Sequence, residues 1–158
     1  LDTKKTTGVM MFILSTIGGV SWILITENMT DHVAALIFSI TKNPIAILLM
    51  INVFLILAGC VLEAAPIMVL TIPIFVPLIK QLGLDPVHFG VVMVLNLMIG
   101  LITPPVGMIL FVISEISGLE IEKLMRSIIP FILPLVIVLL LITIFPALVL
   151  TIPNWLMP

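Results

Sequence analysis

Residues 94–111 are apolar enough to lie inside a lipid bilayer, yet the centre of this run cannot form a regular helix. Pro104 and Pro105 have no backbone N–H, and the ring of Pro105 disfavours helical backbone at Pro104. In hydrocarbon, a carbonyl that loses its helical partner is costly unless protein, an ion or enclosed water satisfies it. We therefore interpret the break as half of an ion and substrate site that the rest of the chain holds in place.

The composition indicates a membrane protein. Of the 158 residues, 62% are hydrophobic and 9% are charged, whereas a soluble domain carries about 25% charged residues. The net charge of −2 gives no sign of a nucleic-acid partner. The single cysteine, Cys60, excludes an intrachain disulfide, and no metal, phosphate-loop or nucleophile motif is present. The sequence therefore predicts an all-α integral membrane protein without an organic cofactor, embedded in lipid.

The first predicted region, residues 1–43, is a transmembrane helix followed by an amphipathic connector. Residues 8–26 form the expected span, and residues 27–43 carry apolar side chains at helical spacing among polar ones. His32 lies in this connector, and we interpret it as a surface residue rather than a proton relay. Because the chain begins with Leu1 rather than Met, we expect it to be a fragment or the later part of a longer polypeptide.

The second predicted region, residues 44–117, holds the two interruptions. Asn43 and Pro44 mark a helix start, and two apolar arms of about 15 residues, each about 22 Å long, flank an interruption at 59–66. Such arms fall short of a bilayer core of about 30 Å, which favours a re-entrant hairpin, although kinked spans remain an alternative. Residues 87–117 are either a second hairpin or one long helix unwound at 100–105.

The third predicted region, residues 118–158, begins with a charged amphipathic connector at 118–127 and continues with a final span at 128–150. Lys123 and Arg126 lie in the connector, and the positive-inside rule then places it in the cytoplasm and the C-terminus outside. In the second region, residues 66–79 contain Pro66, Pro73 and Pro77, so a straight helix is not expected there.

The break near Gly100 has the dipoles that a transporter site needs. A half-helix ending near Gly100 would present carbonyl oxygens to Na⁺, and one starting near Pro105 would present N–H groups to a carboxylate. Thr103 adds a hydroxyl oxygen, the ligand type that hard cations prefer. Asn96 precedes Gly100 by one turn and could orient the loop. The alternative is that the two prolines only kink a helix.

Glu63 is the only charged residue between Lys42 and Lys80. A carboxylate at the centre of a membrane helix costs about 2.5–3.5 kcal/mol on insertion scales, so Glu63 is a functional candidate as a ligand or proton carrier. The alternative is that it caps free N–H groups or faces a water-filled mouth. An intramembrane enzyme using Glu63 as acid or base would need a second positioned group, which no membrane segment offers, so we predict no enzyme.

Three segments resemble one transporter family. Residues 82–107 (LGLDPVHFGVVMVLNLMIGLITPPVG) are similar to the signature of the large membrane subunit of the tripartite ATP-independent periplasmic (TRAP) transporters. Residues 51–63 (INVFLILAGCVLE), with the prolines that follow, resemble the family's preceding element, and 131–146 resembles its closing span. The resemblance covers most of residues 43–150, whereas residues 1–42 agree with the family only in general character.

This resemblance implies a Na⁺-coupled, elevator-type secondary transporter of the bacterial inner membrane. Such proteins take up organic acids, for example sialic acid or C4-dicarboxylates, delivered by a periplasmic substrate-binding protein (P type), with a small membrane subunit (Q type) as partner. The family's large subunit has two inverted repeats, each with a hairpin and a broken helix. This chain would be the second repeat, with residues 44–117 as its transport region, packed against the N-terminal half of the same subunit.

The resemblance also implies which residues form the site. One Na⁺ site would involve Gly59, Gly100 and Thr103, with backbone carbonyls near Val106 or Met108. The substrate would meet the residues of the break itself: Thr103, Pro104, Pro105 and Gly107. The competing interpretation is a pore-forming or structural subunit of another membrane complex, in which the breaks only shape a pore.

Overall fold

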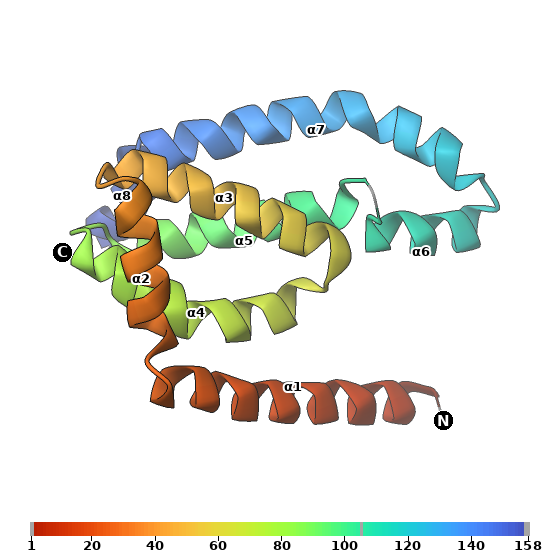
Figure 1. The fold of residues 1–158 in the computed structure, drawn as a ribbon. Coiled ribbons are helices and arrows are strands. Elements are labelled where there is room, and N and C mark those ends of the chain that lie inside the picture. Colours follow the sequence, from red (N-terminus) through yellow and green to blue (C-terminus); the bar gives the residue numbers. More distant parts are fainter. Residues whose placement is uncertain (1, 105, 157–158) are drawn as a thin grey trace.

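Eight α-helices and no strand make up residues 2–104 and 106–156, which are the residues that the computed structural model describes (Figure 1). The all-α prediction is confirmed. The helices are α1 (Asp2–Thr26), α2 (Met29–Ile40), α3 (Pro44–Val61), α4 (Ala64–Gln81), α5 (Pro86–Ile102), α6 (Met108–Ser117), α7 (Ile121–Ile144) and α8 (Ala147–Leu156).

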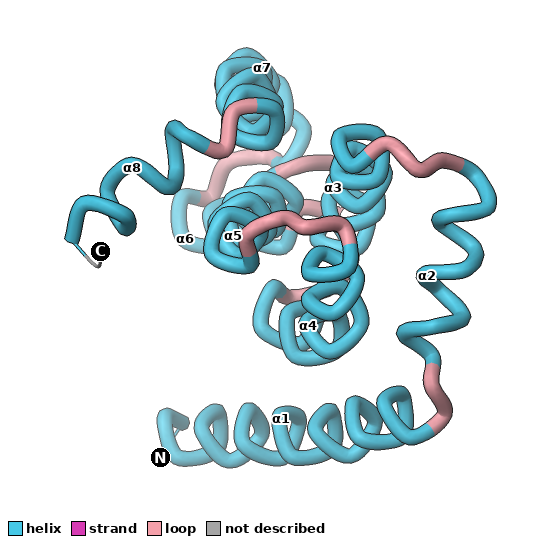
Figure 2. Tube along the Cα trace, turned by 90° about the vertical axis from the view of Figure 1, so that its left-hand side faces the viewer, coloured by secondary structure: helices cyan, strands magenta, loops and turns pink. Residues whose placement is uncertain are grey.

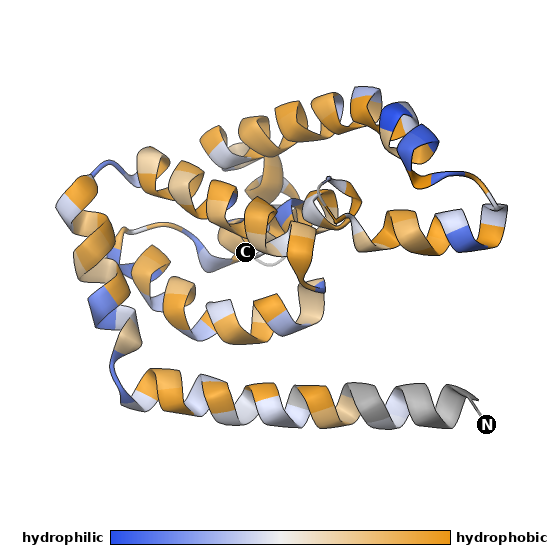
Figure 3. Cartoon of the chain, turned by 45° about the vertical axis from the view of Figure 1, so that its right-hand side comes forward, coloured by the Kyte–Doolittle hydropathy of each residue, from blue (hydrophilic) through white to orange (hydrophobic). Residues whose placement is uncertain are grey.

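Three of these helices, α3, α4 and α7, are long and apolar enough to cross a membrane. Helix α1 covers the span predicted over 8–26, but it qualifies only together with α2, which it meets at a bend of 66°. Most of the outward-facing surface is apolar, and the hydrophilic residues gather where helices begin and end (Figure 3). A surface of this kind suits lipid rather than water.

Helices α3 and α4 form a tight turn-back (Figure 1). Asn43 accepts a hydrogen bond from the Ile45 N–H at 3.0 Å and so caps the start of α3, as predicted. The interruption is narrower than the expected 59–66, because only Leu62 and Glu63 leave the helical conformation. Pro66 lies in the first turn of α4, where a missing N–H costs nothing. Each arm therefore reaches 18 residues.

The core lies where α3 packs along α5, with α4 against both (Figure 2). The two backbones approach most closely at a pair of glycines: a Cβ placed on Gly100 would lie 2.8 Å from the Gly59 Cα. Real Cβ atoms do not come that close to backbone, so the two helices can make this contact only because glycine has no side chain. The fully buried side chains that α3 and α5 contribute to this core are Ile47, Leu48, Ile51, Leu55, Phe89, Met93 and Leu97.

Helix α2 is the predicted amphipathic connector, and its apolar residues divide between two environments. Ala34 and Ile37 are buried in the core, whereas Leu36 and Ile40 are exposed. Seen nearly along α3, α4 and α5, helix α2 stands to one side of the bundle and α1 crosses beneath α4 (Figure 2).

The C-terminal helices differ from the expected connector and span. Residues 121–127 are not a separate connector but the first turns of α7, which ends at Ile144 rather than near 150. Pro146 explains this end, because it has no N–H and it disfavours helical backbone at Phe145. Phe145 accordingly leaves the helix (φ −114°, ψ 83°), and α8 begins beyond the proline.

Candidate ion and substrate site at the break between α5 and α6

The break separates two helices that are each too short to span a bilayer. Helix α5 has 17 residues and α6 has 10, which correspond to about 26 Å and about 15 Å against a core of about 30 Å. The helical conformation persists through Gly100 to Ile102, so the break lies at 103–107 rather than at the expected 100–105. In Figure 1, α6 continues beyond the end of α5 on the far side of this loop.

Thr103 donates two hydrogen bonds at the end of α5, where Pro104 and Pro105 have no backbone N–H to donate. Its N–H donates to the Gly100 carbonyl at 3.0 Å, and its hydroxyl donates to the Ile99 carbonyl at 2.6 Å. The Leu101 carbonyl has no helical donor, because position 105 is a proline. The Thr103 hydroxyl keeps its oxygen lone pairs when it donates its hydrogen, so this oxygen can still bind a cation.

The turn-back of α3 brings further residues to the same place. Gly59 lies against Gly100 through their backbones. The neighbouring Cys60 thiol is 3.8 Å from the Pro104 carbonyl oxygen, within reach of a weak hydrogen bond. Thus Gly59, Gly100, Thr103 and Pro104, which the resemblance assigns to the site, are close together. The signal that could have identified Cys60 is its position beside Gly59.

On the far side of the break, Gly107 has left-handed backbone (φ 56°, ψ 69°), and a Cβ there would lie 2.9 Å from Leu110 Cδ1. No side chain caps the start of α6, so the N–H groups of its first turn have no side-chain partner. Val106 is half-buried in the turn, and Met108 begins α6 with its side chain exposed. Pro105 lies outside the described residues.

Asn96 has a different role from the expected one. Its amide donates to the Asn52 carbonyl on α3 at 3.1 Å instead of orienting the loop. Asn52 in turn donates to the Thr143 hydroxyl on α7 at 2.9 Å, which joins three helices through buried polar groups. The side-chain oxygens of both asparagines have no donor within the described part of the chain.

Glu63 lies in the two-residue turn between α3 and α4, with its side chain exposed. Its carboxylate makes no capping hydrogen bond to the start of α4, which was the structural alternative. No ion pair to Glu63 occurs in residues 2–104 and 106–156. The carboxylate is therefore available to groups beyond this chain.

Comparison with known proteins tests the resemblance to the TRAP transporters. The family model described as "Tripartite ATP-independent periplasmic transporter, DctM component" matches residues 1–148. The chain belongs to the DctM family. The resemblance read from its motifs is confirmed, and the family is one of transporter permeases rather than enzymes.

Several DctM relatives are similar over nearly the whole chain. It is 38% identical to the sialic acid TRAP transporter large permease protein SiaM of Vibrio cholerae, over 97% of this chain and 36% of SiaM. It is 37% identical to the C4-dicarboxylate TRAP transporter large permease protein DctM of Pseudomonas aeruginosa, over 99% of this chain and 36% of that protein. The isethionate TRAP transporter permease protein DctMQ of Oleidesulfovibrio alaskensis is 43% identical over 79% of this chain and 20% of DctMQ. The chain thus spans about a third of SiaM and DctM.

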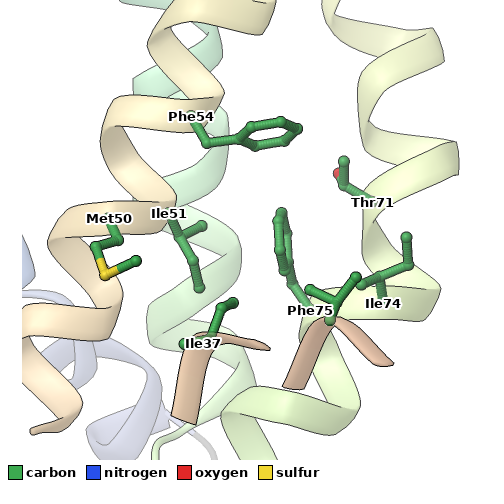
Figure 4. A pocket seen from close by; sticks show the side chains of 8 residues that line it. Ile37, Met50, Ile51, Phe54, Thr71, Ile74 and Phe75 are labelled. Carbon is green, nitrogen blue, oxygen red and sulfur yellow. The ribbon is translucent and has the colours of Figure 1, made fainter. Parts of the chain in front are cut away.

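A groove of about 290 Å³ between α2, α3 and α4 is a poor candidate for the DctM substrate site (Figure 4). Thr71 is the polar side chain in its lining, and its hydroxyl already donates to the Ile67 carbonyl at 2.6 Å. No residue of the break lines this groove. An anion would lose its hydration there without gaining hydrogen bonds. The lining residues are Val33, Ile37, Met50, Ile51, Phe54, Thr71, Ile74 and Phe75.

Proposed function

We propose that this chain supplies half of the ion and substrate site of a TRAP transporter large permease, which takes up an organic acid across the bacterial inner membrane with Na⁺ as coupling ion. The observation that carries the proposal is the break at 103–107, pressed against Gly59 of the α3–α4 turn-back. Membership of the DctM family supplies the transport context.

The proposed Na⁺ site lies at the C-terminal end of α5. Carbonyl groups at a helix C-terminus carry partial negative charge, and Na⁺ is a hard cation that prefers oxygen ligands. The proposed ligands are the Thr103 hydroxyl and the backbone carbonyls of Gly59 and Gly100, joined by those of Val106 and Met108. The close contact between Gly59 on α3 and Gly100 on α5 supports this proposal, because it brings two of the proposed ligand residues together.

The proposed substrate contact lies on the other side of the break. The uncapped start of α6 offers backbone N–H groups at the positive end of a helix dipole, which suits an anionic group. Thr103, Pro104, Pro105 and Gly107 would line the contact. The relatives are named for sialic acid, a C4-dicarboxylate and isethionate, all of which carry an acidic group. An organic anion is therefore the proposed substrate class.

The proposed assembly includes the remainder of the large permease, a small Q-type membrane subunit and a P-type periplasmic binding protein. The name DctMQ of one relative is compatible with a Q-type partner. We propose an elevator movement in which residues 44–117 carry the site across the membrane, and helices α5 and α6 act as one broken span.

The function is tested by uptake of a labelled organic acid into proteoliposomes that contain the full-length permease and the Q-type subunit. We expect uptake only with the binding protein present and an inward Na⁺ gradient imposed. Uptake that ignores both would contradict the proposal and favour a pore-forming subunit, because a pore needs neither a gradient nor a delivery protein.

Glu63→Gln tests the exposed carboxylate in the same assay. The side chain makes no cap bond, so the free energy of unfolding should change by no more than about 0.5 kcal/mol, as for ordinary surface substitutions. We expect uptake to fall severalfold while the amount of inserted protein stays constant. If uptake and insertion decline together, Glu63 has a structural role instead.

A further inference from the structure

Pro73, Pro77 and Pro146 are among the prolines that leave backbone carbonyls without their helical donors. A proline has no N–H, so the carbonyl four residues before it loses its hydrogen bond. Pro73 and Pro77 lie inside α4 and free the carbonyls of Val69 and Pro73. Pro146 lies just beyond α7 and frees the carbonyl of Ile142. In hydrocarbon, such a carbonyl has no water to accept from.

A side chain from a different helix donates to each of these three carbonyls. The Ser21 hydroxyl on α1 donates to the Val69 carbonyl at 2.7 Å. The Thr30 hydroxyl on α2 donates to the Pro73 carbonyl at 3.2 Å. The His88 ring on α5 donates through Nε2 to the Ile142 carbonyl at 2.7 Å. Ser21 and His88 are buried, so water cannot replace them as donors.

This pattern is selective. Most serine and threonine hydroxyls in the described residues bond a carbonyl of their own helix, as Ser39 does with Leu36. Among the hydrogen bonds of the described residues, five run from a side chain to the backbone of another helix or of the break, and three of these five end on a carbonyl that a proline has freed. The other two are those of Cys60 and Asn96.

The prolines of α7 provide the contrast. Pro130 and Pro134 lie on its exposed face and free the carbonyls of Arg126 and Pro130. No side chain of the described residues donates to either carbonyl. Donors are therefore matched to the two prolines of α4 and to Pro146, and not to the prolines on the outer face of α7.

We propose that Ser21, Thr30 and His88 are positioning residues, each of which links two helices by donating a hydrogen bond to a carbonyl that a proline has freed. We call each such interhelical hydrogen bond a joint. Ser21 and Thr30 fasten α4 to α1 and α2, which explains why α4 continues through two prolines. His88 fastens the start of α5 to the corner between α7 and α8. Because α5 carries Gly100 and Thr103 at its other end, this joint holds one side of the break in place. The proposal holds whatever substrate the protein carries.

The test depends on replacing the side-chain donor of each joint by the backbone N–H that the proline lacks. Pro73→Ala restores the backbone N–H of residue 73, which can then donate to the Val69 carbonyl. The Ser21 hydroxyl should therefore be dispensable in this variant. In the full-length permease, Ser21→Ala should lower the folding equilibrium constant about threefold to tenfold, the range of interhelical hydrogen bonds in membranes. In the Pro73→Ala background the same change should have no effect. His88→Phe should likewise lower the folding equilibrium constant of the parent and have no effect in the Pro146→Ala background.

A spectroscopic signature separates a hydrogen bond from general packing. With ¹³C-carbonyl-labelled Val69, solid-state NMR should show a shift towards the free-carbonyl value in Ser21→Ala, and the original value in Ser21→Thr, which keeps the hydroxyl. Ser39→Ala is the matched control and should leave the signal unmoved. An unmoved Val69 signal in Ser21→Ala, or equal destabilisation with and without Pro73, would overturn the proposal. A Ser21→Ala variant that folds only when Pro73→Ala is added would support it.

Discussion

Gly100→Ala should destabilise the protein and abolish uptake. The added Cβ would lie 2.8 Å from the Gly59 Cα and 2.9 Å from its carbonyl carbon, and backbone atoms cannot rotate away as a flexible side chain can. Helices α3 and α5 would have to separate, which costs about 1–3 kcal/mol for an overpacked core. Separation would also move Gly59 away from the proposed ion ligands. Thermal unfolding in detergent and proteoliposome uptake measure the two effects.

Gly90→Ala is the matched control on the same helix. A Cβ on Gly90 would meet no atom within 4 Å, and alanine favours a helix interior by about 0.5–1 kcal/mol over glycine. This variant should therefore be as stable as the parent or slightly more so. Gly59→Ala, whose Cβ would lie 3.3 Å from the Gly100 Cα, should fall between the two. If Gly100→Ala were as stable and active as Gly90→Ala, the close contact would not be required.

Thr103→Ala should weaken the response to Na⁺ more than it weakens the fold. The substitution removes the proposed hydroxyl ligand and the bond to the Ile99 carbonyl. Hydrogen bonds to charged groups are worth about 1.5–3 kcal/mol, so loss of a comparable ion contact predicts at least about a tenfold rise in the Na⁺ concentration for half-maximal uptake. Uptake rates measured across a series of Na⁺ concentrations give this value.

Thr103→Ser and Thr103→Val separate the hydroxyl from the shape of the side chain. Serine keeps the hydroxyl and should retain most of the Na⁺ response, whereas valine keeps the shape and should resemble alanine. An unchanged half-maximal Na⁺ concentration in the valine variant would remove Thr103 from the ion site.

Local chemistry made much of the fold predictable. The scarcity of charge predicted apolar helices, Asn43 with Pro44 predicted the start of α3, and Pro104 with Pro105 predicted the break. Each of these features depends on residues within a few positions of one another. The break itself lies two to three residues later than expected, because Thr103 supplies hydrogen bonds that let α5 continue to Ile102.

The remaining features depend on residues far apart in the chain. Pro73 alone indicates a disrupted helix, and nothing near it in sequence shows that Ser21, 48 residues before Val69, donates to the carbonyl that Pro73 leaves free. Asn96 stood out as a polar residue beside the break, but its link to Asn52 and onward to Thr143 exists only once three helices are packed. For the candidate site, the residue types were readable from the sequence, whereas the Gly59–Gly100 contact that joins its two parts required the structure.

Binding of ²²Na⁺ to the purified full-length permease tests the proposed ion site by itself, because it requires neither a known substrate nor a binding protein. We expect saturable binding that unlabelled Na⁺ displaces and K⁺ does not, with at least about a tenfold loss of affinity in Thr103→Val. Absence of saturable binding, or the same affinity in the parent and in Thr103→Val, would contradict a Na⁺ site at the break between α5 and α6.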